Sequence, residues 1–171
     1  TAIFTIEDNS APTIDVVAVD QTVESDGAGN SGALTAWLNS HGGATATDAC
    51  GSVTWTNDFV SLSDLCGATG AATVTFTATD DCGNSAATTA TFTIEDTTPP
   101  TVDVAAVALT VECDGLGNPA QVDSWLDNQG NASATDIGGT VSWTHDYAGL
   151  SDECGATGSA SVTFTATDEC G

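Results

Sequence analysis

The sequence contains no lysine, no arginine and no methionine, and it has 24 acidic residues with a formal net charge of -24. A chain without basic side chains cannot neutralise the phosphates of nucleic acids or anionic lipids, so both are excluded as partners. Such a charge also repels itself in the compact state unless cations screen it. We therefore expect bound multivalent cations, with Ca²⁺ as the first candidate. The alternative is that the acidity serves solubility or reflects a salty habitat.

Long apolar runs are also missing. No segment approaches the roughly 20 apolar residues that a membrane helix needs, and no secretory signal peptide is visible. Direct insertion into a membrane is therefore not expected.

An internal repeat organises what is present. Shifting the sequence by 88 positions aligns Thr1–Gly83 with Thr89–Gly171 without gaps, and 50 of the 83 aligned pairs are identical. Such identity indicates tandem domains of one fold. We expect residues 1–8 to be the last strand of a preceding repeat, 9–96 to be the first repeat, and 97–171 to be a second repeat cut before its last strand, as in a piece of a longer array.

The local pattern predicts an all-β fold. Apolar residues alternate with threonine in five segments bounded by Gly, Asn and Asp, and this pattern is typical of a two-layer β-sandwich. The segments are 2–7, 12–19, 52–58, 72–80 and 89–95. One short helix per repeat is expected, because Leu34, Trp37 and Leu38 share the spacing of Val122, Trp125 and Leu126.

The ends of this helix carry recognisable signals. Asn118 is the expected N-cap, with Pro119 at the first helical position, and Gly42 or Gly130 closes the segment. The helix tryptophans, Trp37 and Trp125, are expected to plug the core; the alternative is that they stack on sugars.

Six cysteines indicate an oxidising compartment. The aligned cysteine positions are 25 and 113, 50 and 138, 66 and 154, and 82 and 170, with Ser25 and Gly138 as replacements. If segments 52–58 and 72–80 are antiparallel neighbours, their ends bring Cys50 close to Cys82. We favour the disulfides Cys50–Cys82 and Cys113–Cys154, although the sequence does not fix the connectivity. Zinc is the weaker alternative, because close CxxC pairs are absent.

Three oxygen-rich loops recur in each repeat and predict metal sites, because Ca²⁺ binds six to eight oxygens. The candidate ligands are Glu24, Asp26, Asn30, Glu112, Asp114 and Asn118 in the first loop, Glu7, Asp8, Asp15, Glu95, Asp96 and Asp103 around the junction of the repeats, and Asp80, Asp81, Asn84 and Asp168 in the third. The alternative is that these residues only build turns.

Catalysis has little support. His41 and His145 do not align with each other and lie in no zinc or nucleophile motif, so both are expected at the surface, and no enzyme is predicted.

The segments TATDDCGN (77–84) and IEDTTPPTV (94–102) resemble HYR-like and Ig-like tandem repeats of large bacterial surface proteins, especially those of flavobacterial gliding and surface adhesins. The resemblance implies Ig-like sandwiches, export to the cell surface by the type IX secretion system of Bacteroidetes, and attachment to surfaces or carbohydrate. Asp96-Thr97-Thr98 is similar to an O-glycosylation motif of that phylum.

The expected function is a calcium-stiffened, disulfide-linked stalk repeat of a secreted adhesin, with neighbouring repeats as partners. Two alternatives stay open. One is a subunit of an extracellular filament, in which copies of the chain complement one another by strand addition. The other is a carbohydrate-binding or ice-binding module that uses its threonine rows, with surface glycans among its partners.

Overall fold

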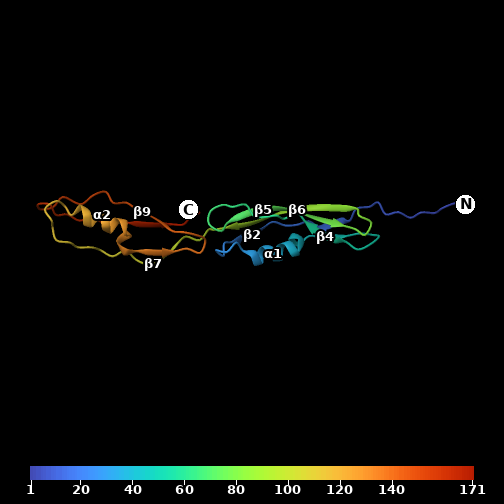
Figure 1. The fold of residues 1–171 in the computed structure, drawn as a ribbon, viewed down its shortest axis with the longest axis horizontal. Coiled ribbons are helices and arrows are strands. Elements are labelled where there is room, and N and C mark those ends of the chain that lie inside the picture. The colour runs from blue at the N-terminus through green and yellow to red at the C-terminus, as the bar shows by residue number, and fades with distance from the viewer. The chain divides into compact units, whose positions relative to one another are not determined.

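The structure is a computed structural model that describes residues 1–171, and these form two compact units, Thr1–Asp96 and Thr97–Gly171 (Figure 1). The predicted all-β, sandwich-like fold is confirmed, with one short α-helix in each unit. We call residues 88 positions apart counterparts.

Unit 1 is built on a four-stranded sheet in the order β2-β6-β5-β4 and a separate antiparallel pair, β1-β3. Its elements are β1 (Thr13–Val16), β2 (Gln21–Glu24), α1 (Ser31–Asn39), the 3₁₀ turn η1 (His41–Gly43), β3 (Thr45–Thr47), β4 (Thr54–Asn57), β5 (Gly70–Thr79) and β6 (Ser85–Glu95). In the four-stranded sheet, β6 pairs parallel with β2 and antiparallel with β5, and β5 pairs antiparallel with β4.

The alternation in the sequence sets which side chains enter the core. Val74, Phe76 and Ala78 of β5 are fully buried, while the threonines between them stay partly exposed. This period of two is the signature of a strand with one face on the core. In β6, Phe92 and Ile94 follow the same rule.

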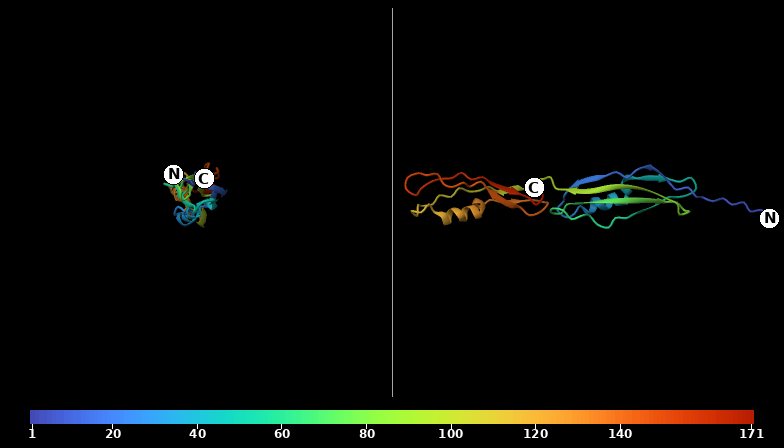
Figure 2. Two further views of the ribbon diagram at one scale, coloured as in Figure 1. Left: turned by 90° about the vertical axis from the view of Figure 1, so that its right-hand side faces the viewer. Right: turned by 90° about the horizontal axis from the view of Figure 1, so that it is seen from above.

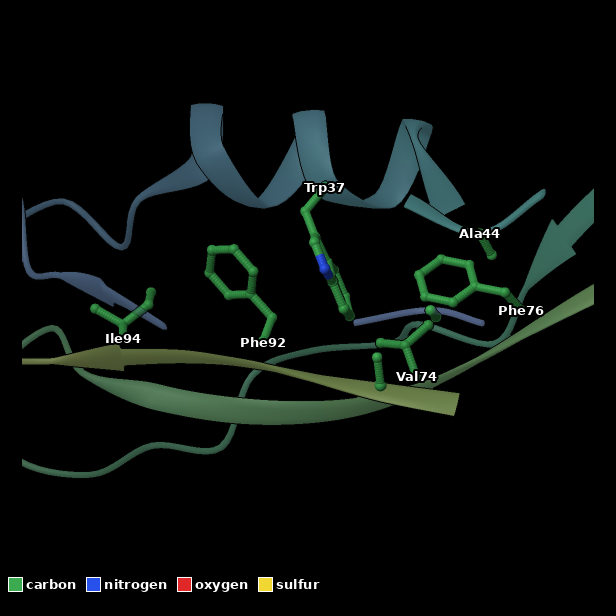
Figure 3. Close-up of a cluster of buried hydrophobic side chains, with 8 residues drawn as sticks. Trp37, Ala44, Val74, Phe76, Phe92 and Ile94 are labelled. Atoms are coloured by element: carbon green, nitrogen blue, oxygen red, sulfur yellow. The ribbon is translucent and has the colours of Figure 1, made fainter. Parts of the chain in front are cut away.

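Helix α1 covers the apolar face of this sheet. Figure 3 shows Trp37 reaching from α1 toward the strands, between Phe92 and Phe76. Its ring centroid lies 5.2 Å from that of Phe76 and 5.5 Å from that of Phe92, and its Nε1 donates to the Val19 carbonyl at 3.1 Å. Trp37 is 4 % exposed, so it plugs the core as predicted and is inaccessible to sugars.

The helix N-termini agree with the prediction in position but not in side-chain bonding. Asn30 and Asn118 precede the two helices in a left-handed conformation, and neither makes a side-chain cap bond. The Asn118 amide instead donates to the Glu112 carbonyl at 2.9 Å, and its oxygen accepts the Asp114 N–H at 3.1 Å. Asn118 is therefore the N-cap residue, with Pro119 at the first helical position as predicted, but its side chain closes the preceding loop and makes no bond to the helix.

Unit 2 repeats the pattern with fewer paired strands. It contains β7 (Thr101–Val104), α2 (Pro119–Asp127), η2 (Gln129–Asn131), β8 (Ser133–Thr135), β9 (Ser142–His145) and β10 (Phe164–Thr167). Antiparallel pairs form between β7 and β8 and between β9 and β10. The counterparts of β2 (109–112) and of the first part of β5 (158–163) are not strands, because residues 97–171 include no counterpart of β6 to pair with them.

Residues 1–8 were expected to be a strand, and in the structure they are not. They leave unit 1 as an extended tail (Figure 2). Ile3, Phe4 and Ile6 of this tail are 91 %, 89 % and 85 % exposed.

The histidines differ in their environments. His145 is exposed as expected, but His41 is half-buried and stacks on Trp55 at a centroid distance of 4.9 Å. The surface prediction is therefore wrong for His41, which has a packing role.

Candidate functional site

A group of three potential ligands lies where the N-terminal tail enters unit 1. Ligand atoms of Asp8, Asp48 and Cys50 lie within 4.8 Å of one another. Asp48 follows β3, and its carboxylate accepts the Cys50 N–H at 2.8 Å, which fixes the turn. The Asp8 carboxylate accepts the Ser10 N–H at 3.1 Å. Each carboxylate keeps a second oxygen outside these bonds.

The β5–β6 turn borders this group and holds Asp8 in place. The buried Asp80 carboxylate accepts the backbone N–H groups of Cys82 at 2.8 Å and Asn84 at 2.9 Å, and the Asn84 side-chain amide at 2.9 Å. The same Asn84 amide donates to the Asp8 main-chain oxygen at 3.2 Å. Burial alone raises the pKa of Asp80, but the hydrogen bonds from Asn84, Cys82 and Gly83 outweigh it and lower the pKa.

Cys82 reports the negative potential of this site. Burial raises the pKa of its thiol, and the neighbouring Asp8 and Asp80, then Cys50 and Asp81, raise it further. Because a thiolate placed here meets several other negative charges, the site favours a bound cation over an additional anion.

Unit 2 carries a second acidic group, which shares one counterpart position with the first. Carboxylate oxygens of Asp136 and Asp168 lie within 4.8 Å of each other. Asp136 accepts the Gly138 N–H at 2.7 Å, and Asp168 accepts the Cys170 N–H at 2.8 Å. Asp136 is the counterpart of Asp48, and Gly138 stands where unit 1 has Cys50.

The donor chemistry of these groups fits a hard divalent cation. Carboxylates are the ligands that Ca²⁺ prefers, and each group brings carboxylate oxygens within 4.8 Å of other potential ligand atoms. The Cys50 thiol adds a soft donor in unit 1 only, which makes that group less selective for Ca²⁺ than the oxygen donors of unit 2.

The first predicted loop is closed by its own hydrogen bonds. The Asp26 carboxylate accepts the N–H groups of Ala28 at 2.8 Å and Asn30 at 2.9 Å, and these bonds lower its pKa. In unit 2 Asp114 repeats this with Leu116 at 2.7 Å, and its pKa is lowered in the same way. The turn-building alternative therefore describes this loop, which contributes to neither acidic group.

Several other predicted ligands lie outside these two groups. Asp15 accepts the Thr47 hydroxyl at 3.1 Å and Asp103 accepts the Thr135 hydroxyl at 3.2 Å, so both tie a first strand to its partner. Asp81 accepts the Ser52 N–H at 3.0 Å, which joins the loop before β4 to the turn after β5. Glu7 and Glu95 are exposed.

Sequence reasoning missed Asp48 and Asp136. Both follow a short strand in the counterpart segments TATD (45–48) and SATD (133–136), and this recurrence was the available signal. Neither segment is rich in glycine or in further acidic residues, which are the features that mark the three predicted loops.

The cysteines depart from the expected pairing. Cys50, Cys82, Cys113 and Cys154 are free thiols, so both predicted disulfides are wrong in the structure. Cys66 and Cys170 are disulfide-bonded instead. The strands next to Cys50 and Cys82 are antiparallel neighbours as expected, because β4 pairs with β5 and Thr54 lies opposite Thr79. However, Cys50 and Cys82 sit in separate turns that Asp48 and Asp80 hold by backbone hydrogen bonds.

No helix in the chain has the length and apolar character needed to cross a bilayer. No protein-family model matches the sequence, and no curated protein matches it either.

Proposed function

We propose that this chain is a structural stalk segment of a secreted cell-surface adhesin, in which Ca²⁺ and disulfides stiffen tandem Ig-like domains. The observation that carries the proposal is that an acidic group recurs around one counterpart pair, Asp48 in unit 1 and Asp136 in unit 2. A binding site that stabilises the fold is expected in every repeat, whereas a catalytic site is needed only once in a chain.

The charge balance supports this proposal. With 24 acidic residues and no basic side chain, cations are the only available counter-charges. A Ca²⁺ ion held by Asp8 and Asp48 would fasten the entering chain to the loop after β3. The arrangement would stiffen the point where the chain enters the domain.

The proposed location rests on the cysteines and on the family resemblance. Disulfide-bonded cysteines such as Cys66 and Cys170 are typical of exported proteins. The resemblance to gliding-type surface adhesins points to export by type IX secretion and display on the cell surface. Neighbouring repeats and surface glycans are the proposed partners.

Thermal unfolding tests the proposal. Ca²⁺ should raise Tm over EDTA by an amount that NaCl of matched ionic strength does not reproduce, because specific binding acts by mass action on the folded state. Asp48→Asn and Asp136→Asn should each remove part of this rise. Asp64→Asn removes an exposed charge outside both groups and should keep the full rise.

Equal effects of Ca²⁺ and NaCl would show that the carboxylates are only screened. In that case the acidity serves solubility, and the calcium part of the proposal fails.

A further inference from the structure

The four-stranded sheet of unit 1 has one face on the core and one face toward solvent. Helix α1 and the buried side chains of β5 and β6 lie on the core face (Figure 3). The solvent face carries ten threonines, at the odd-numbered positions 73–79 of β5 and 89–93 of β6, at Thr54 and Thr56 of β4, and at Thr22 of β2. None of them is buried. We call this surface the threonine face.

The strand register arranges these threonines as a grid. Each of them lies opposite another threonine on the neighbouring strand, as Thr73 lies opposite Thr91 and Thr77 lies opposite Thr56. The Oγ1 atoms of Thr73 and Thr91 are 3.0 Å apart. The strand spacing and twice the rise per residue give repeats of about 4.8 Å across the strands and about 6.7 Å along them. Hydroxyl and methyl groups therefore recur in two dimensions.

Charge is confined to one end of the threonine face. Glu24 and Glu95 are its two acidic side chains, and they lie opposite each other where β2 and β6 end. The other outward positions of the four strands hold threonine, serine or alanine. In a chain with a formal charge of -24, such a surface is complementary to an uncharged partner rather than to a cation or a basic protein.

The hydroxyl groups recur in unit 2. Seven of the ten threonines, those of β2, β4 and β5, have counterparts there, and these are five threonines with Ser142 and Ser161. Exposed apolar residues elsewhere are not kept, since the counterpart of Val60 is Ala148 and that of Leu65 is Glu153. Strand formation alone accepts Val, Ile or an aromatic residue as readily as Thr. The retained hydroxyls therefore indicate a role for this surface beyond forming strands.

A neutral grid of this kind is suited to ordered water. The threonine hydroxyl donates and accepts hydrogen bonds, whereas the methyl group beside it does neither. Water over the methyl groups must bond to other water molecules, which restricts its orientation, and the hydroxyls anchor that water at regular intervals. The two repeats of the grid are close to the spacings of oxygen atoms in the ice lattice.

We propose that the threonine face is an ice-binding site, which holds the chain on the surface of an ice crystal. The competing partner is the flat surface of a crystalline polysaccharide, but the face has no aromatic side chain on which a sugar ring could stack. The proposal does not depend on Ca²⁺ or on the stalk function, because Asp8, Asp48 and Asp136 lie outside these strands.

Partition into slowly growing ice tests the proposal. The full chain in EDTA should be enriched in the ice relative to a co-dissolved reference protein, and it should slow the recrystallisation of fine-grained ice. The double variant Thr56→Asp, Thr89→Asp places two charges on the face and should lose both effects. The control Thr13→Asp, Thr45→Asp adds the same charge at exposed threonines of β1 and β3, outside the face, and should keep both effects.

Exclusion of the wild type from ice would overturn the proposal, as would equal enrichment of the double variant. Thermal melts show whether each variant is folded. Should the double variant be unfolded, Thr22→Asp changes one exposed position at the edge of the face instead and should reduce the enrichment.

Sedimentation with crystalline cellulose separates the two partners. A wild type that is excluded from ice but sediments with cellulose, and a double variant that does neither, would assign the face to a polysaccharide and overturn the assignment to ice.

Discussion

The side-chain amide of Asn84 donates hydrogen bonds to the main-chain oxygen of Asp8 at 3.2 Å and to the carboxylate of Asp80 at 2.9 Å. One amide therefore fastens the entering chain to the β5–β6 turn, 76 positions away in the sequence.

We expect Asn84→Asp to destabilise unit 1 by about 1–3 kcal/mol in EDTA, because it removes both donated bonds and adds a charge beside Asp80. Urea unfolding measures the effect. Ser61→Asp adds the same charge in an exposed loop and should change stability by less than about 0.5 kcal/mol. Similar losses in both variants would mean that general repulsion, rather than the Asn84 bonds, is responsible.

Gly70 permits a close approach at the start of β5. A Cβ atom at this position would lie 2.0 Å from the Ser63 carbonyl oxygen, which is a backbone atom and cannot rotate away. Gly70→Ala should therefore cost at least about 1–3 kcal/mol in a urea titration. At Gly32 in α1 a Cβ meets nothing within 4 Å, so Gly32→Ala should be neutral or stabilise by up to about 1 kcal/mol.

Truncation of two counterpart phenylalanines tests whether the core of unit 2 is less buried than that of unit 1. Phe76 is fully buried and packs on Trp37, so Phe76→Ala should cost about 3–5 kcal/mol. Phe164 packs on Trp125 but is half-buried, so Phe164→Ala should cost clearly less. Local unfolding free energies from hydrogen exchange in β5 and β10 provide the comparison. Equal costs would contradict the open core of unit 2.

The strands and the core could be predicted from the sequence where the pattern is local. The alternation in β5 and β6 assigns Phe76 and Phe92 to one face, and the helical spacing places Trp37 over them. These features follow from periodicities of about two and 3.6 residues, which a sequence displays directly.

The candidate site could be predicted only in part, because it depends on contacts between distant segments. Asp8 was identified from its junction motif, but its neighbour Asp48 comes from a turn that the β1–β3 pairing positions. Asp26 and Asp114 have equally suggestive sequences, yet backbone N–H groups within their own loops occupy them. A carboxylate in a loop of Gly and Asn residues can accept backbone hydrogen bonds of its own turn or bind a metal, and the segments that lie beside the loop decide which.

The lowered pKa of Asp80 sets the sign of a pH effect. A carboxylate whose pKa is lower in the folded than in the unfolded state stabilises the fold above its unfolded value of 3.8, and this contribution is lost as the pH falls through the folded pKa. Asp80→Asn should therefore lower Tm at pH 7, and the difference from wild type should shrink below about pH 4. A difference that stays constant with pH would assign the effect of the substitution to shape rather than charge.

The Cys82 thiol offers a chemical probe of the acidic site. Its raised pKa keeps the thiolate scarce, and after burial the largest cause is the charge of Asp8. Asp8→Asn should therefore speed alkylation of Cys82 by iodoacetamide at pH 8, by less than about tenfold, since one full pKa unit changes the thiolate fraction tenfold. Peptide mass spectrometry resolves the rate at this residue from those of the other free cysteines.

Asp15→Asn is the matched control, because Asp15 pairs with Thr47 and is not among the charges that act on Cys82. If both variants react at the wild-type rate, burial alone suppresses the thiolate, and the negative potential assigned to this site is too weak to select a cation.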